Sequence, residues 1–420
     1  MKRYKICVIG LGYVGLPLAH SLSVYHDVIG YDSNSKRIGE LKRFHDRTGE
    51  ISYDDLNNTE LKLTPDPKNI KDRNVYIITV PTPINEQKQP DLTAVIESSK
   101  LVGEKIKPGS IVVYESTVYP GVTEEECGPI IEQVSGLVCG KDFWLGYSPE
   151  RINPGDSVHS LSEITKVVSG QNEEITEILS GIYGSINKGK IFKATSIKVA
   201  EAAKVIENTQ RDINIAFVNE ISMIFSNLGL STLDILETAK TKWNFLDFRP
   251  GLVGGHCIGV DPFYLAYKAQ EIGVNPEIIL AGRRINDNMG KFIAKKIMQE
   301  LAVGDNIIIL GFTFKENVTD IRNTKVIDIY NTLNKSGFKV EISDPKADKN
   351  EVKEVHDIDL VSIKKEKKYE AIIIAVQHEE YRKLSIEDLG AFLNPKGLIF
   401  DLKGILRAED NSKGIRIISF

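Results

Sequence analysis

The sequence has no apolar run that approaches the roughly 20 residues a membrane-spanning helix needs. It also has no excess of positive charge, since 58 acidic and 53 basic residues give a net charge of -5. Nucleic acids and anionic membranes attract clustered Lys and Arg, so the composition excludes both as general partners. The first strand-like run, Lys5 to Ile9, follows Met1 closely and is too short for the core of a signal peptide. We therefore expect a cytoplasmic protein.

Cysteine is scarce too, since the 420 residues include only Cys7, Cys127, Cys139 and Cys257. So few cysteines, without an export signal, are more typical of free thiols than of a disulfide framework. Low-complexity stretches are absent, and 41% hydrophobic with 26% charged residues is the composition of a folded protein. Because one hydrophobic core rarely serves a chain of this length, the sequence predicts two or three domains.

The first part of the chain, residues 1–195, predicts a Rossmann-like domain. Residues 4–32 combine a strand, a Gly-rich turn, a helix and a second strand, which together form one βαβ unit. Further strand-like runs follow, separated by segments of helical length, and this alternation favours a mostly parallel, doubly wound sheet. These runs are Val75 to Val80, Ile111 to Glu115 and Phe143 to Tyr147.

Residues 196–301 are predicted to be mainly helical. Apolar residues recur every three, four or seven positions from Ser196 onward, Gly229 supplies a stop, and the last clear helical pattern is Lys291 to Leu301. A helix of about 30 residues usually joins domains or packs against a partner chain. Its apolar positions are Val199, Ala203, Ile206, Ile213, Phe217, Ile221, Ile224 and Leu228.

From Asn306 the pattern of the first domain returns. Four strand-like segments recur in the same order, so residues 302–420 predict a second Rossmann-like domain. This copy lacks two glycines of the first turn, because Phe312 and Thr313 follow Gly311 directly. We therefore expect it to bind something other than a dinucleotide pyrophosphate. The matching segments are NIIILG and KICVIG, KVEISD and DVIGYD, YEAIIIAV and NVYIITV, and GLIFDLK and SIVVYES.

A dinucleotide-binding fingerprint lies between the first strand and the first helix. Gly10 permits a tight turn, Gly12 lets the backbone approach a pyrophosphate, and Gly15 lets helix and strand pack closely. Asp32 ends the second strand, where a carboxylate accepts hydrogen bonds from the adenosine ribose and repels a 2′-phosphate. The fingerprint therefore predicts binding of NAD in preference to NADP.

A second motif surrounds Cys257 in the segment GGHCIGVD. Glycines around a cysteine let a substrate approach closely, and Asp261 could act as a base or orient water, so the segment resembles a nucleophile site. The alternative is a small buried hydrophobic residue in a Gly-rich turn, which is the commoner fate of a single Cys. For His256 we favour a turn residue that makes a local hydrogen bond.

Lys204 and Asn208 lie four residues apart on the predicted long helix and therefore share one face. Their surroundings are apolar and rich in Ala, so both side chains could point into a cleft, where a lysine could stabilise a developing alkoxide. The alternative is a solvated pair on an exposed face.

Three polar loops follow strands of the first domain, and ligands of open parallel sheets bind at this edge. The loop with Ser148 to Arg151 contains Glu150, which could serve as a general base; the alternative is a surface carboxylate beside Arg151. The other loops are Pro81-Thr82-Pro83 and Ser116-Thr117.

Taken together, these motifs resemble the UDP-glucose/GDP-mannose dehydrogenase family over essentially the whole chain. The family has an N-terminal NAD domain, a central helical dimerisation domain and a C-terminal domain for the nucleotide sugar. The resemblance therefore implies NAD as cofactor, no metal, and a homodimer formed through the central domain. The motifs that carry it are GxGYVG, Ser116-Thr117, SPE, Lys204 with Asn208, GGxC with Asp261, and GFTFKxxxxDxR.

Members of this family oxidise the C6 alcohol of the sugar to a carboxylate with two NAD per sugar. The resemblance implies that Cys257 attacks the C6 aldehyde to form a thiohemiacetal, whose oxidation leaves a thioester for water to hydrolyse. The resemblance also implies roles for five other catalytic residues. Lys204 and Asn208 hold the C6 oxygen, and Asp261 assists proton transfer. Glu150 serves in thioester hydrolysis, and Thr117 positions a water.

The resemblance also implies two sets of binding residues. Those for NAD are Gly10, Gly12, Tyr13, Val14, Gly15, Asp32, Arg37, Thr82, Thr117 and Arg322. Those for the sugar nucleotide are Glu150, Arg151, Asn153, Lys204, Asn208, Gly254, Lys315 and Arg249, the last reaching into the site of the neighbouring subunit.

The sequence departs from the UDP-glucose enzymes at two places. Arg151 to Gly155 replace their usual Phe-Leu and second acid, and His256 stands where they have Ser. The segments SPERINPG, RPG at 249–251 and GGHCIGVDP look like the branch that oxidises UDP-N-acetylhexosamines for capsule or O-antigen synthesis. We therefore expect UDP-GlcNAc or UDP-GalNAc as substrate, with UDP-glucose and UDP-ManNAc as alternatives.

Two other functions are open at this point. A two-electron hydroxyacid dehydrogenase of the β-hydroxyacid type also places Lys and Asn four apart on a helix, but it needs neither Cys257 nor a second Rossmann-like domain. A redox-sensing protein could bind NAD and carry a reactive thiol without turnover. Production of NADH distinguishes an enzyme from such a sensor.

Overall fold

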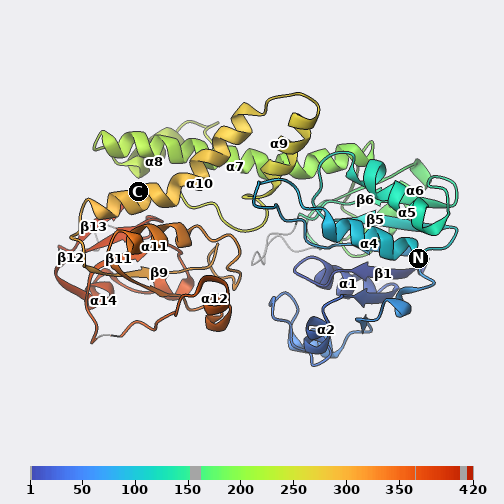
Figure 1. Ribbon diagram of the computed structural model, residues 1–420, viewed down its shortest axis with the longest axis horizontal. Helices are drawn as coiled ribbons and strands as arrows, with labels where there is room; N and C mark the ends of the chain where they lie inside the picture. Colours follow the sequence, from blue (N-terminus) through green and yellow to red (C-terminus); the bar gives the residue numbers. More distant parts are fainter. Residues whose placement is uncertain (1, 152–161, 365, 407–413, 420) are drawn as a thin grey trace. The chain divides into compact units, whose positions relative to one another are not determined.

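The computed structural model describes residues 2–151, 162–364, 366–406 and 414–419. The chain forms two compact units, one made of residues 1–207 with 263–275 and the other of residues 208–262 with 276–420. Each unit contains a Rossmann-like sheet, and helices of the middle of the chain belong to both (Figure 1). The predicted α/β class with two Rossmann-like parts and central helices is confirmed. The bounds 1–195, 196–301 and 302–420 stay a prediction.

Within the described residues, the first sheet has eight strands in the order β3-β2-β1-β4-β5-β6-β7-β8. β1, β4 and β5 read as continuous apolar runs because parallel strands in the middle of a sheet are covered on both faces. β7 pairs antiparallel with β6, and β7 and β8 lie in a part of the sequence that predicted no strand. The strands are β1 (Lys5–Ile9), β2 (Asp27–Tyr31), β3 (Lys62–Thr64), β4 (Val75–Ile78), β5 (Ser110–Tyr114), β6 (Phe143–Tyr147), β7 (Lys166–Gly170) and β8 (Ile191–Lys193).

Helices of this unit bury apolar side chains against the sheet. Leu16, Ala19 and Leu22 of the first helix are inaccessible to solvent and belong to the same cluster as Val8. The helical segments are α1 (Gly15–Ser23), α2 (Ser35–Leu41), α3 (Tyr53–Asn57), η1 (Pro67–Ile70), α4 (Thr93–Gly103), η2 (Val122–Cys127), α5 (Gly128–Ser135), α6 (Glu173–Gly184) and most of α9 (Asp261–Glu271).

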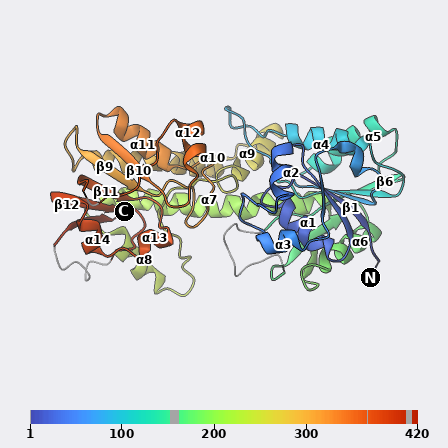
Figure 2. The same cartoon turned by 90° about the horizontal axis from the view of Figure 1, so that it is seen from below.

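The long helix predicted from Ser196 is α7 (Ile197–Asn227), which continues without a break for 31 residues (Figure 2). Gly229 follows it with φ +70°, the left-handed conformation that ends a helix, so the predicted stop is confirmed. The unit boundary falls within α7 after Glu207. α8 (Thr232–Lys240) and α10 (Glu277–Met298) follow, α10 including most of the last predicted helical segment.

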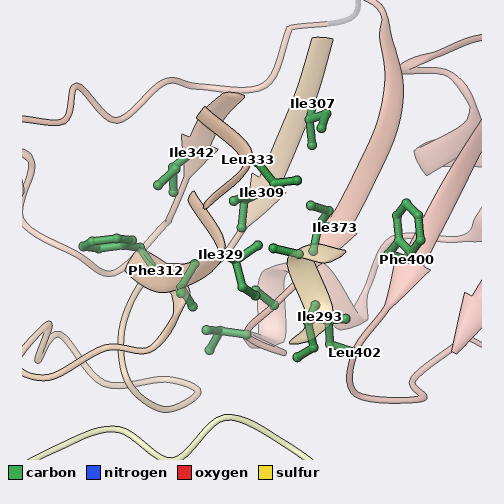
Figure 3. Packing of buried hydrophobic residues seen from close by; sticks show 14 of the residues in the cluster. Ile293, Ile307, Ile309, Phe312, Ile329, Leu333, Ile342, Ile373, Phe400 and Leu402 are labelled. Carbon is green, nitrogen blue, oxygen red and sulfur yellow. The ribbon is translucent and has the colours of Figure 1, made fainter. Parts of the chain in front are cut away.

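The second sheet repeats the topology of the first, as the sequence repeat predicts. Its described strands run in the order β10-β9-β11-β12-β13, all parallel, so β9 lies between β10 and β11 as β1 lies between β2 and β4. Ile307 and Ile309 of β9 pack with Ile329 and Leu333 in a dry core (Figure 3). The elements are β9 (Asn306–Leu310), α11 (Val326–Lys335), β10 (Lys339–Ser343), α12 (Lys349–His356), β11 (Tyr369–Ile374), α13 (Glu379–Arg382), α14 (Ile386–Gly390), β12 (Leu393–Asp401) and β13 (Arg416–Ser419).

Candidate functional site

The Gly-rich turn adopts the geometry that its three glycines predict. Gly10 has φ +93°, which a residue with a side chain rarely adopts. A Cβ on Gly15 would lie 1.8 Å from the carbonyl oxygen of Gly10 and 2.3 Å from Oγ1 of Thr79, so only glycine fits where α1 meets the strands. A Cβ on Gly12 would meet no described atom within 4 Å. The turn therefore leaves open space at Gly12, beside the N-terminus of α1, where a phosphate is expected to bind.

Asp32 and Arg37 flank this turn. The carboxylate of Asp32 accepts hydrogen bonds from the backbone N–H of Leu11 (2.9 Å) and of Asn34 (2.8 Å). Arg37 is buried, donating from Nε to the carbonyl of Leu11 and pairing through Nη2 with the buried Asp46 at 2.7 Å. Its Nη1 has no hydrogen-bond partner among the described residues. A buried donor beside the open space at Gly12, with a carboxylate at the end of β2, fits a dinucleotide.

The loops after β4 and β5 are joined to each other. Oγ of Ser116 donates to the carbonyl of Val80 at 2.6 Å, and the hydroxyl of Tyr147 donates to the carbonyl of Ser116. Thr82 and Thr117, the predicted ligand residues of these loops, are partly exposed. Both therefore lie at the carboxyl edge of the sheet, where ligands of such folds bind.

Glu150, which follows β6, is 6% exposed, so the alternative of a surface carboxylate is wrong. Its Oε1 accepts the N–H of Arg151 at 2.6 Å, and its Oε2 lies 3.2 Å from Nζ of Lys166. The exposed side chain of Arg151 pairs with Glu207 instead. Asn153, the remaining predicted residue of this loop, lies outside the described residues.

Three of the predicted residues, Cys257, Asp261 and Asn208, are linked by hydrogen bonds. Asp261 begins α9, its N–H donates to the carbonyl of Cys257 at 2.8 Å, and its buried carboxylate accepts Nδ2 of Asn208 at 2.6 Å. Lys204 lies one turn before Asn208 on α7 and is 8% exposed, so the alternative of a solvated pair on an exposed face is wrong. Cys257 is partly exposed, which makes its thiol accessible in a way that a core residue is not.

The loop that carries Cys257 is held from both sides within its unit. The amide of Asn219 on α7 bonds both the N–H and the carbonyl of Gly251, at 2.8 and 3.0 Å. Nδ2 of Asn323 donates to the carbonyl of Gly255, which has φ +77° and whose Cβ would lie 2.8 Å from the ring of Phe314. Because of these contacts, the glycines of this loop serve close packing as well as substrate access.

His256 contacts a residue far along the chain in addition to its neighbour Cys257. Its Nδ1 lies 3.5 Å from the carboxylate of Asp320, which Arg322 also contacts at 2.7 Å. Burial alone lowers the pKa of His256, but the nearby carboxylate of Asp320 and the proximity of Cys257 outweigh it and raise the pKa to about 9. The residue before the cysteine is therefore a cation at neutral pH.

The remaining predicted residues lie apart from this cluster or on its edge. The carbonyl of Lys315 accepts Oγ1 of Thr313 at 2.8 Å, which orders the loop that follows β9. Arg249 is exposed and pairs with Glu237 and, at 3.0 Å, with Asp247. Gly254 lies against the carbonyl of Asn323, and a Cβ there would approach it to 2.8 Å.

Sequence reasoning missed the buried charges that support these loops. Lys166 and Glu115 lie behind Glu150, and His378 contacts the buried Asp344 at 3.0 Å in the second unit. Each comes from a segment that reads as an ordinary strand or loop. The sequence shows Glu115 as a charged residue at the end of an apolar strand, which is unusual for a buried position. It does not show that Lys166 is the residue that pairs with Glu115.

Comparison with known proteins assigns the chain to a family along nearly its whole length. Models of the UDP-glucose/GDP-mannose dehydrogenase family match residues 4–187 (NAD binding domain), 198–288 (central domain) and 308–408 (UDP binding domain). The chain belongs to this family. It is therefore an NAD-dependent dehydrogenase of UDP-sugars, and the Gly-rich turn of the first unit lies in the NAD-binding domain.

Relatives cover the chain from end to end. The UDP-N-acetyl-D-glucosamine 6-dehydrogenase of Salmonella typhi is 52% identical over 418 residues, 98% of each chain. Protein CapL of Staphylococcus aureus is 52% identical over 412 residues, 97% of each chain. The solved structure of the UDP-D-ManNAc dehydrogenase from Pyrococcus horikoshii superimposes with a TM-score of 0.89 at 30% identity, covering 99% of this chain and 98% of that one.

Among the described residues, no group of three or more His, Cys, Asp or Glu is arranged to hold a metal ion. In the same part of the chain, no helix combines the length and the apolar character that crossing a membrane requires.

Proposed function

We propose that this dehydrogenase oxidises the C6 alcohol of a UDP-N-acetylhexosamine, UDP-GlcNAc or UDP-GalNAc, to the uronate in two two-electron steps, for synthesis of a surface polysaccharide. The observation that carries the proposal is the accessible Cys257, bonded through its backbone to Asp261, which in turn bonds Asn208. A nucleophile next to an acid is what a four-electron oxidation requires and a two-electron oxidation does not. The 52% identity to a UDP-N-acetyl-D-glucosamine 6-dehydrogenase supports the choice of sugar.

Bound NAD supplies the hydride acceptor at C6 in both steps. Sγ of Cys257 adds to the C6 aldehyde after the first step, and the resulting thiohemiacetal is the species that the second step oxidises to a thioester. The covalent bond keeps the aldehyde from leaving before it is oxidised. Water then cleaves the thioester, releasing the carboxylate and restoring the thiol.

The other predicted catalytic residues receive distinct tasks in this proposal. Nζ of Lys204 and Nδ2 of Asn208 hold the C6 oxygen and stabilise the charge that develops on it as the proton leaves. Asp261 fixes the orientation of the Asn208 amide through their 2.6 Å hydrogen bond and assists proton transfer. Thr117 positions the hydrolytic water and Glu150 takes its proton.

The proposed binding residues fall into two groups, one for the cofactor and one for the sugar nucleotide. For the cofactor we propose Asp32 at the adenosine ribose together with the fingerprint turn and Arg322. For the sugar nucleotide we propose the loop of Lys315 in the second sheet, with contacts from Arg151, Asn153 and Gly254. The full cofactor set is Gly10, Gly12, Tyr13, Val14, Gly15, Asp32, Arg37, Thr82, Thr117 and Arg322.

We also propose a homodimer formed through the central helices, with Arg249 contributing to the partner's site. The supporting observation is an apolar stripe on α7 that stays exposed in the single chain. Its members recur at spacings of seven, eleven, seven and four, which returns them to one side of a helix. They are Val199, Ile206, Phe217 and Ile224 on α7 and Leu228 directly after it, each between 49% and 66% exposed.

The deciding experiment counts NADH formed per sugar with a panel of UDP-sugars. We expect two NADH per UDP-N-acetylhexosamine and a carboxylate product, identified by mass spectrometry. One NADH per sugar with released aldehyde would contradict the four-electron reaction. Faster turnover of UDP-glucose or UDP-ManNAc than of both N-acetylhexosamines would keep the mechanism and overturn the substrate.

A further inference from the structure

A buried cluster of charges lies directly behind Glu150. Nζ of Lys166, the first residue of β7, lies 2.6 Å from Oε2 of Glu115 and 3.2 Å from Oε2 of Glu150. The hydroxyl of Tyr183 on α6 donates to the other oxygen of Glu115 at 2.5 Å, and its ring lies 5.4 Å from the same ammonium. The side chains of Lys166 and Glu115 are 1% and 0% exposed, so this cluster is sealed from solvent.

The cluster holds one cation between two carboxylates. Burial raises the pKa of Glu115, and the charge of Lys166 opposes that rise. For Lys166 burial works to lower the pKa, but the two carboxylates outweigh it and the pKa ends above its ordinary value. The ammonium therefore stays charged throughout the neutral range. An interior cation that contacts a carboxylate stabilises the ionised form of that carboxylate.

Other groups that face Glu150 act in smaller or opposite ways. The N–H of Arg151 donates to Oε1, while the guanidinium of Arg151 pairs with Glu207. Glu50 approaches from the segment after α2; burial raises the pKa of Glu50, and the charges of Asp46 and Glu150 add to the rise. Glu50 and Glu115 both disfavour ionisation of Glu150. The contact of Lys166 with Glu150 acts against both of them.

We propose that Lys166, held by Glu115 and Tyr183, is a positioning residue that fixes Oε2 of Glu150 and keeps this carboxylate ionised for hydrolysis of the thioester. The inference rests on the role proposed above for Glu150. An ion pair that served stability alone would change the melting temperature without moving the pH profile of kcat. The pH profile of kcat therefore separates the two possibilities.

The test compares three variants of the cluster in the full-length enzyme. In Lys166→Met the acid limb of the pH profile of kcat should move up by about 1 to 3 pH units, because Glu150 loses its cation. In Glu115→Gln the same limb should move down, because a competing carboxylate disappears and Lys166 pairs with Glu150 alone. Lys166→Arg should leave the limb near its original pH. The KM for the UDP-sugar should change less than about threefold in each, since the cluster lies behind the base.

A matched control comes from the second unit. Arg283 is another buried cation between two carboxylates, 2.6 Å from Asp212 and 2.6 Å from Asp287. Arg283→Met should lower the melting temperature as Lys166→Met does, but it should leave the acid limb in place. An equal shift of the limb in both methionine variants, or no shift in any variant of the cluster, would overturn the proposal.

A second measurement does not depend on turnover. ¹³C-carboxyl NMR of glutamate-labelled protein, with the Glu150 signal assigned from Glu150→Gln, gives the pKa of Glu150 directly. It should fall in Glu115→Gln, a variant that keeps the cation and does not depend on Lys166→Met folding. An unchanged pKa of Glu150 in that variant would sink the inference. If no UDP-sugar yields NADH, the proposed function fails, while this titration still decides whether Lys166 controls Glu150.

Discussion

The turn between β1 and α1 offers a direct test, because its glycines face different neighbours. A Cβ on Gly15 would lie 1.8 Å from the carbonyl oxygen of Gly10, where ordinary contact begins at 3.4 Å, so α1 would have to retreat by about 1.6 Å. A Cβ on Gly12 would meet no described atom within 4 Å. Gly15→Ala should therefore damage the fold and the cofactor site together, whereas Gly12→Ala should damage the cofactor site alone.

The expected magnitudes follow from packing. Forcing an extra methyl group into a filled core costs about 1 to 3 kcal/mol. At about 2 to 4 °C per kcal/mol for a domain of this size, Gly15→Ala should lower the melting temperature by about 2 to 12 °C. Gly12→Ala should stay within about 0.5 kcal/mol of the original stability. Its Kd for NAD should rise by about tenfold or more, because the new methyl group occupies space that the pyrophosphate needs.

The assay is thermal unfolding without cofactor, combined with calorimetric titration of NAD. Gly181→Ala serves as the control, because its Cβ also meets no described atom within 4 Å but the residue lies in α6, which carries none of the proposed cofactor residues. This control should melt no lower than the original protein and bind NAD equally well. Unchanged NAD affinity in Gly12→Ala would refute the assignment of the open space to the pyrophosphate.

Three further predictions address the reaction, the pH dependence of stability and the assembly. Cys257→Ala should abolish formation of the carboxylate while the calorimetric Kd for NAD stays unchanged; undiminished turnover would remove Cys257 from the mechanism. Glu201 accepts hydrogen bonds from the N–H groups of Gly121 and Thr123, and burial raises its pKa from 4.5 to about 7. Between these two pH values the folded protein holds a proton on Glu201 that the unfolded chain has lost. The free energy of unfolding should therefore fall as the pH rises through this range. Glu201→Gln should reduce that fall, measured as the difference between urea midpoints at pH 5 and pH 8. Phe217 is 56% exposed in the single chain. Phe217→Asp should convert the dimer to a monomer, as measured by analytical ultracentrifugation. A monomeric original protein would contradict the proposed interface.

Much of the fold could be predicted because it depends on local patterns. The apolar runs at Lys5–Ile9 and Asn306–Leu310 both become central strands, since an unbroken apolar run of this length has to be covered on both faces. The heptad-like spacing from Ser196 becomes the single helix α7. By contrast, β7 starts with a buried lysine and pairs antiparallel, so neither its composition nor an expected βαβ alternation reveals it.

The candidate site divides in the same way. Residues on one short segment, such as the glycines of the first turn or Lys204 and Asn208 on one helix face, could be found because sequence spacing fixes their relation. The contact of Glu150 with Lys166 could not be found, although the residues lie only 16 positions apart, because it depends on how β6 and β7 pair. Nor could the contact of His256 with Asp320, which arises when two distant loops of one unit pack together.

The two sheets also show how one topology serves two ligands. Gly10 and Gly311 take nearly the same φ, +93° and +94°, and each is followed by an N–H that donates to an aspartate ending the next strand, Asp32 or Asp344. Asp32 stays partly exposed. Asp344 is buried and accepts four backbone N–H groups, and it also contacts His378 at 3.0 Å.

A carboxylate saturated in this way cannot also bind the ribose of a dinucleotide without giving up contacts made in the interior. Instead it fixes the loop after β9, because His378 lies 3.1 Å from Oγ1 of Thr313, and Thr313 bonds the carbonyl of Lys315. The aspartate that we propose for the ribose in the NAD-binding domain therefore has a counterpart in the UDP-binding domain, Asp344, that acts as a structural anchor. Asp344 fixes the position of the loop that carries Lys315.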